Sequence, residues 1–167
     1  MKIFLTGKPG SGKSTVLIKT IELLKKKGLK VGGIVTPEIR KGRKRIGFKV
    51  IDIFSGEEGI LATTKRGNGP KLGKYWMKRS DFERIALKAL DFASKECDVV
   101  CIDEIGKLEF FSQLFRQKVY VIAESEKPLI ATVHKSYAKE FKRFGKIIEV
   151  NSENREKLPK KLFGIFK

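Results

Sequence analysis

The sequence contains few side chains that bind soft metals or form cross-links. Its 167 residues include two cysteines, Cys97 and Cys101, and one histidine, His134. We expect both cysteines on one strand, where four residues separate their Cα atoms by roughly 13 Å, a distance that no disulfide spans. With so few thiol and imidazole groups, a zinc site is not expected either. Both cysteines are therefore predicted to be buried, unreactive thiols.

Long apolar runs are also absent. Hydrophobic residues make up 41% of the chain, which is enough for a packed core and argues against disorder. No apolar run approaches the roughly 20 residues that cross a bilayer. At the N-terminus, Gly7 interrupts the apolar segment before it could form the core of a signal peptide. The sequence therefore predicts one domain, residues 1–167, in a cytoplasmic protein with no membrane contact.

Acidic residues are scarce relative to basic ones. The chain has 37 lysines and arginines but 19 acidic residues, a net charge of +18, and such a balance favours nonspecific contact with nucleic acid. The basic residues are scattered along the sequence, however. A content of 34% charged residues with two glutamines and three asparagines is also typical of thermophilic proteins. Both interpretations of the charge stay open.

A glycine-rich segment near the N-terminus matches the phosphate-binding loop pattern G-x-x-x-x-G-K-[ST]. The apolar residues 3–5 predict a strand before it, and a helical apolar spacing predicts a helix over about 13–27, ended by Gly28. Backbone N–H groups of such a loop bind phosphate oxygens at the helix N-terminus. The Lys13 ammonium neutralises β- and γ-phosphate charge, and the Ser14 hydroxyl can ligate Mg²⁺. The predicted nucleotide-binding residues are Gly7, Lys8, Pro9, Gly10, Ser11, Gly12, Lys13, Ser14 and Thr15.

Predicted strands and helices alternate along the rest of the chain. A capping box from Ser80 to Glu83 predicts the start of a helix, and Pro159 is expected to disturb a C-terminal helix. Residues 65–74 are expected to form a mobile loop. The pattern predicts a three-layer α/β fold of the P-loop type (RecA/ASCE-like), with a mainly parallel sheet and a small antiparallel excursion. The other predicted strands are 31–36, 47–53, 59–64, 98–103, 129–133 and 146–150, and another helix covers 112–125.

An acidic pair follows a predicted buried strand. An apolar run over residues 99–102 ends in Asp103 and Glu104, and the carboxyl ends of parallel strands lie at the edge of the sheet where ligands bind. Asp103 can hold Mg²⁺ there as the Walker B acid, together with Ser14. Glu104 can orient and deprotonate an attacking water. The alternative is that both acidic residues only cap the next helix.

Charge that develops in the transition state requires a further cation. The candidates are Lys8, Lys107 and three arginines of a basic turn, Arg40, Arg43 and Arg45. Any one of these arginines can equally be a solvated surface charge.

Two polar residues end the strand after the Asp103 strand. Thr132 and His134 are candidates to contact the terminal phosphate or its water. A histidine at a strand end is more often structural, so this role stays open.

Several segments together resemble a P-loop nucleoside-triphosphatase family found in thermophilic archaea and bacteria and, in vertebrates, as the cancer-related nucleoside-triphosphatase. The most distinctive segment is Asp103-Glu-Ile-Gly-Lys-Leu-Glu109, in which Leu108 stands where the family often has methionine. The resemblance implies Mg²⁺-dependent hydrolysis of nucleoside triphosphates, ATP and GTP included, to the diphosphate and phosphate, with broad base tolerance. The other matching segments are Gly7 to Thr15, Thr36-x-Glu38-x-Arg40, Arg45-x-Gly47-Phe48, Phe111-Ser-Gln-Leu-Phe115 and Asn154-Arg155.

Two other functions stay open. A small-molecule or nucleotide kinase would close its basic turn and the 65–74 loop over an acceptor, excluding water from the transfer. A nucleic-acid-associated module regulated by ATP would bind in a salt-dependent way, but the chain has no RNA-binding motif. A GTP-specific switch is disfavoured because no Asn-Lys-x-Asp element is present. Hydrolysis by water is the preferred prediction because an acid pair ends the strand.

Overall fold

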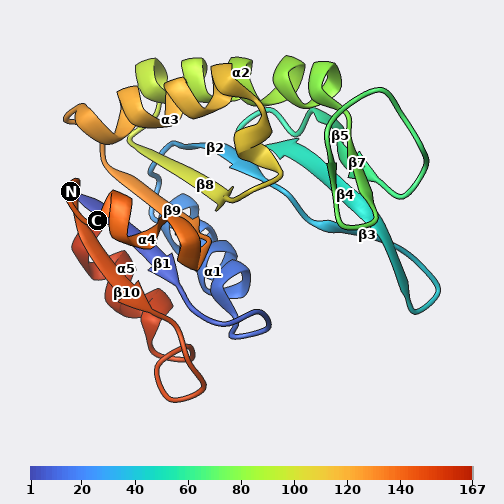
Figure 1. Cartoon of the computed structure of the whole chain (residues 1–167). Helices are drawn as coiled ribbons and strands as arrows, with labels where there is room; N and C mark the ends of the chain where they lie inside the picture. The colour runs from blue at the N-terminus through green and yellow to red at the C-terminus, as the bar shows by residue number, and fades with distance from the viewer. Residues whose placement is uncertain (167) are drawn as a thin grey trace.

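Five parallel strands form the half of the sheet that carries the phosphate-binding loop. In the computed structural model, which describes residues 1–166, they lie in the order β10 (Lys146–Glu149), β1 (Lys2–Thr6), β9 (Leu129–Val133), β8 (Val99–Ile105) and β2 (Val31–Val35). Each neighbouring pair is parallel, and the crossovers between them carry the helices (Figure 1). The predicted parallel α/β architecture is confirmed.

The antiparallel part continues the same sheet beyond β2. It runs through β4 (Lys44–Asp52), β5 (Glu58–Thr63), β7 (Tyr75–Met77) and β6 (Lys71–Leu72), while β3 (Glu38–Lys41) pairs with β4. In this region the predicted strands 47–53 and 59–64 correspond only to parts of β4 and β5. Two of the strands that the sequence analysis missed are two and three residues long, too short for an alternating pattern to show.

Helices cover both faces of the parallel half. α1 (Lys13–Lys26) and α5 (Leu158–Phe166) pack on one face, and α2 (Arg79–Glu96), α3 (Gln113–Glu124) and α4 (Lys135–Phe141) on the other (Figure 1). No helix in residues 1–166 combines the length and apolar character needed to span a membrane.

Alternating side chains of the strands fill the two cores. Phe4 in β1 faces the α2–α3–α4 side, whereas Ile3 and Leu5 face α1 and α5. Phe141 is fully buried, with its ring centroid 5.2 Å from that of Phe4. Replacing such a phenylalanine with alanine costs about 3–5 kcal/mol. The central strands that position the site are therefore held firmly from both faces.

The ends of α1 and α5 follow from single residues. Gly28 has a φ of 93°, its N–H bonds the carbonyl of Lys25, and the next N–H bonds the carbonyl of Leu24. This is a Schellman motif, so the predicted stop at Gly28 is confirmed. Pro159 lies in the first turn of α5, where a proline disrupts no helical hydrogen bond. The disturbance expected from it is wrong, because Pro159 sits at the start of that helix.

The predicted capping box at Ser80 is also wrong. α2 begins one residue earlier, at Arg79, and no side chain caps it. The Glu83 carboxylate accepts a hydrogen bond from the Ser112 hydroxyl, and Ser112 itself caps α3 by accepting from the Phe115 N–H at 3.1 Å. Glu83 therefore joins two helices instead of capping its own.

Two further expectations need correction, and one helix was not predicted. Cys97 is the C-terminal cap of α2 and lies outside β8, which contains Cys101, although both are buried free thiols as predicted. Residues 71 and 72 of the expected 65–74 loop form β6. α4 was missed because its seven residues are too short for a clear helical apolar period.

Candidate functional site

The glycine-rich loop joins β1 to α1 and leaves the helix N-terminus open. Gly7 has a φ of 148°, and a Cβ there would lie 2.7 Å from the carbonyl oxygen of Val150, so only glycine fits. Gly12 is the N-cap of α1 with a φ of 101°, and it has no side chain that could accept from the first-turn N–H groups. Such unpaired N–H groups, with the helix dipole behind them, form an anion site.

Hydroxyl groups from three elements converge on Asp103 in β8. Ser14 Oγ in α1 donates to Asp103 Oδ1 at 3.1 Å, and Thr132 Oγ1 in β9 donates to the same oxygen at 2.6 Å. Thr36 Oγ1, just after β2, donates to the Asp103 carbonyl oxygen at 2.8 Å. β9 lies between β1 and β8 (Figure 1) and aligns Thr132 with Leu5. This order of strands in the sheet places Thr132 between the glycine-rich loop and Asp103.

Burial raises the pKa of Asp103, and the neighbouring Glu104 charge raises it further, while hydrogen bonds from Thr132 and Ser14 and the charge of Lys13 oppose the shift. A cation would favour the carboxylate in the same way. The hydroxyl and carboxylate oxygens of Ser14 and Asp103 are the hard donors that Mg²⁺ prefers. Residues 1–166 contain no cluster of three or more His, Cys, Asp or Glu that could hold a metal. Phosphate and water oxygens are the further ligands that Mg²⁺ usually takes at nucleotide sites.

Glu104 faces the loop lysine. Its Oε2 lies 3.7 Å from Lys13 Nζ, and this ammonium also donates to the Gly7 carbonyl at 3.2 Å. The structure thus brings Lys13, Ser14, Asp103 and Glu104 together from segments about 90 residues apart in sequence, as expected for the carboxyl edge of the sheet.

A second carboxyl group, Glu109, lies beside Glu104 and was given no separate role by the sequence reasoning. It begins a 3₁₀ helix over Glu109–Phe111 and is only 4% exposed. A Cβ on Gly106 would lie 2.8 Å from Glu109 Oε1 and 3.0 Å from Glu104 Oε1. Burial, together with the charges of Glu104 and Asp103, raises the pKa of Glu109 well above its usual range. The signal in the sequence was a lone acid inside the apolar run Leu108-Glu109-Phe110.

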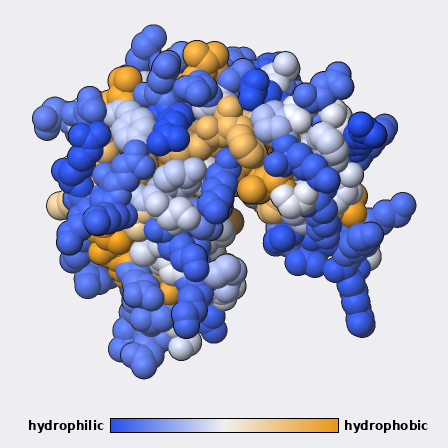
Figure 2. Space-filling view, viewed as in Figure 1, coloured by the Kyte–Doolittle hydropathy of each residue, from blue (hydrophilic) through white to orange (hydrophobic). Residues whose placement is uncertain are grey.

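A cavity of about 430 Å³ opens beside these carboxylates. Figure 2 shows the molecule hollowed between the part that carries α1 and the antiparallel strands, with hydrophobic atoms at the closed end of the hollow. Polar and apolar side chains both line this cavity. The polar residues are Ser14, Thr36, Glu38, Asp103, Glu104, Lys107, Glu109 and His134, and the apolar ones are Ile18, Val35, Pro37, Phe48, Leu61, Leu72 and Leu108.

The arginines of the expected basic turn lie in the β3–β4 hairpin and do not line this cavity. Arg40 pairs with Glu38 at 2.8 Å. Arg45 pairs with the same carboxylate at 3.1 Å and donates to the Tyr75 hydroxyl at 2.7 Å. Arg43 lies exposed in the turn between the two strands. Arg45 thus links β4 to β3 and β7 through Glu38 and Tyr75.

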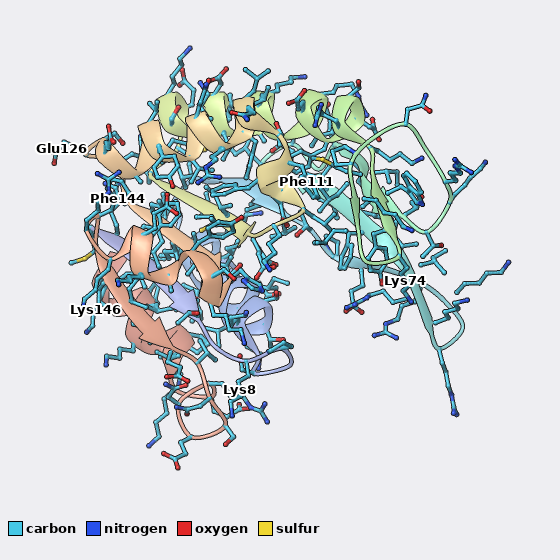
Figure 3. The ribbon with its side chains drawn as sticks, in the orientation of Figure 1. Lys8, Lys74, Phe111, Glu126, Phe144 and Lys146 are labelled. Carbon is cyan, nitrogen blue, oxygen red and sulfur yellow. The ribbon has the colours of Figure 1, made fainter. Side chains whose placement is uncertain are left out.

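The remaining cations differ in position. Lys107 lines the cavity, whereas Lys8 lies on the exposed side of the loop, and Lys74 belongs to the antiparallel part across the hollow (Figure 3). His134 also lines the cavity, and its Nδ1 accepts from the Ser136 N–H at 3.1 Å, capping α4. Burial and the charges of Lys107 and Lys13 lower the pKa of His134, which favours its neutral form, and a role for it in contacting phosphate or water stays a prediction.

Arg155 flanks the loop from the C-terminal segment. Its Cδ would lie 3.3 Å from a Cβ on Gly12. The turn before it is fixed by the Asn151 N–H, which donates to Asn154 Oδ1 at 2.9 Å, and by Asn154 Nδ2, which donates to the Glu149 carbonyl at 2.7 Å. Two asparagines close together before a predicted helix were the signal for this turn.

Comparisons with known proteins agree with this geometry. A family model described as NTPase matches residues 2–163. Nucleoside-triphosphatase THEP1 of Methanocaldococcus jannaschii is 44% identical over 95% of this chain and 92% of its own length, and the enzyme of that name from Thermotoga maritima is 41% identical over 100% and 96%.

Two solved structures share the fold over nearly the whole chain. The crystal structure of THEP1 from the hyperthermophile Aquifex aeolicus has a TM-score of 0.86 at 29% identity and covers 100% of this chain and 99% of its own. The solution structure of a human cancer-related nucleoside triphosphatase has a TM-score of 0.80 at 34% identity, with coverage of 98% and 96%. The open glycine loop, the buried acid opposite it and these full-length similarities agree: the chain belongs to the NTPase family of P-loop nucleoside-triphosphatases.

Proposed function

We propose that this chain hydrolyses nucleoside triphosphates to the diphosphate and inorganic phosphate with the help of Mg²⁺. The observation that carries the proposal is the shared position of Lys13, Ser14, Asp103 and Glu104 at the carboxyl edge of the parallel strands, with distances of 3.1 Å and 3.7 Å linking the two segments. The names of its relatives support the same activity.

Each residue has a distinct proposed role. N–H groups of the loop from Gly7 to Thr15 bind the phosphate oxygens, and the Lys13 ammonium neutralises charge on the β- and γ-phosphates. Ser14 Oγ and Asp103 hold the magnesium ion, which supplies charge neutralisation when it is bound. Glu104 accepts a proton from the attacking water.

Release of Lys13 is part of this proposal. In the free site Lys13 is paired with Glu104 and the Gly7 carbonyl. A triphosphate offers the ammonium several charged oxygens at hydrogen-bond distance, whereas Glu104 Oε2 lies 3.7 Å away and the Gly7 carbonyl is neutral. Nucleotide binding would then leave Glu104 free to accept a proton. Lys107, which lines the cavity, is the proposed further cation for the transition state.

Broad base tolerance and a cytoplasmic location belong to the same proposal. The sequence has no Asn-Lys-x-Asp element for guanine, and the side of the loop away from the cavity carries the exposed Arg155, whose guanidinium can stack on any base. Two buried free thiols suit a reducing compartment.

The net charge of +18 supports a further, nonspecific contact with nucleic acid phosphates. Binding of RNA that weakens steeply with added salt, without change in turnover, is the expected signature. Binding that is absent even at low salt would remove this partner.

The test is a phosphate-release assay over ATP, GTP, CTP and UTP, with Mg²⁺ and with a chelator. We expect similar rates for the four nucleotides and loss of activity on chelation. Asp103→Asn should lose most turnover at all magnesium concentrations. Asp91→Asn is the matched control, because Asp91 on α2 pairs only with Lys118, away from the site. Turnover that persists in chelator would contradict the metal role.

A further inference from the structure

If a nucleotide binds as in the proposed function, the cavity beside Glu104 would lie beyond its terminal phosphate. In the proposed function Ser14 and Asp103 would hold a magnesium ion that neutralises phosphate charge, and the terminal phosphate would lie beside Asp103 and Glu104. The nucleoside then extends the opposite way, toward the loop side where Arg155 lies. Of the residues from Gly7 to Ser14, only Ser14 lines the cavity. Neither the base nor the ribose is therefore expected to fill it.

The cavity is much larger than hydrolysis requires. A volume of about 430 Å³ has room for more than ten water molecules at about 30 Å³ each, whereas hydrolysis uses one. It falls in the range of small-molecule sites, about 300–1,000 Å³. The antiparallel strands supply Phe48, Leu61 and Leu72 to its wall, so this part of the sheet shapes the space opposite the phosphate.

The lining defines the chemistry of the occupant. Apolar side chains line the cavity together with the carboxyl groups of Asp103, Glu104 and Glu109. Glu38 at the rim is already paired with Arg40 and Arg45. Among the lining residues, all of which lie in the described part of the chain, Lys107 carries the one permanent positive charge. An anionic molecule such as a second nucleotide would meet these carboxylates without an arginine clamp, so the lining favours an uncharged ligand.

We propose that this cavity binds an uncharged small molecule with an apolar or aromatic body and a hydroxyl group, and that this hydroxyl replaces water as the acceptor of the terminal phosphoryl group. The inference rests on the proposed function, because it uses the same phosphate, metal and Glu104. The hydroxyl oxygen forms a bond to the γ-phosphorus as the bond from that phosphorus to the bridging oxygen breaks. The electron pair stays on the nucleoside diphosphate, the hydroxyl proton passes to Glu104, and a phosphomonoester leaves the cavity.

Phosphoryl transfer and hydrolysis are then two outcomes of one site. With the cavity filled only by water, the acceptor nearest Glu104 is a water molecule. With an alcohol bound, the apolar body displaces water from the Phe48–Leu61–Leu72 wall and holds the hydroxyl in the same place, which raises its effective concentration. Transfer should therefore increase at the expense of hydrolysis as the alcohol saturates the cavity.

The experiment uses tryptophol, an uncharged indole alcohol, with the whole protein, ATP and Mg²⁺. Binding is measured by titration calorimetry with a non-hydrolysable ATP analogue present, and products are identified by ³¹P NMR. 3-Ethylindole, which lacks the hydroxyl, and the indole-3-acetate anion are the matched probes. We expect tryptophol and 3-ethylindole to bind, the anion to bind about tenfold more weakly or not at all, and only tryptophol to yield a phosphomonoester.

A variant that fills the cavity separates this site from the nucleotide site. Leu72→Trp adds volume on half-buried β6, and it should weaken tryptophol binding about tenfold or more while ATP hydrolysis without tryptophol persists. Leu114→Trp, on α3 and already 54% exposed, is the control and should change neither.

Three results would overturn the inference. They are no tryptophol binding beside the ATP analogue, binding without any phosphomonoester, and a tenfold rise of the KM for ATP in Leu72→Trp, which would place the nucleotide itself in the cavity. In each case continued hydrolysis of ATP alone would leave the proposed function intact. Absence of hydrolysis in the wild-type chain would instead refute the proposed function.

Discussion

Replacing Glu104 with glutamine should change nucleotide affinity and turnover rate in opposite directions. The amide cannot accept a proton from the attacking water, and loss of a general base costs about 10²–10⁴-fold in rate. The same substitution removes the partner of Lys13, whose Nζ lies 3.7 Å from Glu104 Oε2. Lys13 is then free for phosphate before the nucleotide arrives. Turnover should fall while affinity for the triphosphate rises.

The size of the affinity gain follows from the geometry of this ion pair. Two unit charges 3.7 Å apart attract by about 4 kcal/mol at an effective dielectric constant of about 20. The side chains are 14% and 31% exposed, so desolvation and solvent screening offset most of this attraction, and measured pairs of this kind retain about 1 kcal/mol. Breaking the pair beforehand should therefore tighten binding about fivefold. Removal of a negative charge near the γ-phosphate acts in the same direction.

Two measurements test this reasoning. Equilibrium binding of a fluorescent ATP analogue with Mg²⁺ gives the affinity, and single-turnover phosphate release gives the chemical step. Glu140→Gln is the matched control, because Glu140 on α4 pairs with Arg116 at 3.6 Å away from the site; both quantities should stay at wild-type values. A Glu104→Gln protein that turns over within tenfold of wild type, or that binds nucleotide more weakly, would refute the roles given to Glu104 and Lys13.

Three further predictions concern the carboxyl groups and the loop. The pKa of Glu109 is raised in the folded protein, so the stability that its protonated form contributes is fully present below the ordinary carboxyl pKa and is lost as pH rises through the folded-state pKa. Glu109→Gln should therefore match the wild type near pH 4 but melt at a higher temperature than the wild type near pH 8. Equal melting temperatures at pH 8 would contradict the burial argument. Thr132→Val removes the 2.6 Å hydrogen bond that lowers the pKa of Asp103, so the acidic limb of the pH–rate profile should move to higher pH, and an unmoved limb would exclude Thr132 from this role. Gly7→Ala should cost about 1–3 kcal/mol of unfolding free energy and abolish nucleotide binding, because its Cβ would meet a carbonyl oxygen at 2.7 Å. Gly10→Ala, with nothing within 4 Å of its Cβ, should cost only about 1 kcal/mol. Denaturant unfolding of the two variants provides the comparison.

Local sequence patterns were sufficient to predict the strands of the parallel half of the fold. The glycine loop, the apolar run before Asp103 and the helix stop at Gly28 each have a local cause in backbone geometry, so sequence alone located them. The predicted meeting of Ser14 with Asp103 followed from one rule, that the carboxyl ends of parallel strands share an edge. The hydrogen bond of 3.1 Å between these two side chains has that origin.

The parts that sequence could not give depend on long-range pairing. β6 and β7 exist because each finds a neighbour in the sheet, and a strand of two or three residues has no pattern of its own. Arg45 looked like a free cation but is held by Glu38 and Tyr75, a contact set by the register of the hairpin. Glu109 stood in an apolar run without a visible partner, and only the turn at Gly106 brings it next to Glu104.

The reactivity of the two cysteines can report on local opening and on unfolding of the molecule. Cys101 in the centre of β8 is 0% exposed and Cys97 at the end of α2 is 4% exposed, and burial raises the pKa of both thiols. Because only the thiolate reacts, an alkylating dye can modify them only while the chain is transiently open. Cys97 should label through local fraying of the helix end, whereas Cys101 requires separation of central strands. The ratio of the two labelling rates, followed by mass spectrometry as temperature rises, would distinguish loosening at the periphery from cooperative unfolding without any engineered probe.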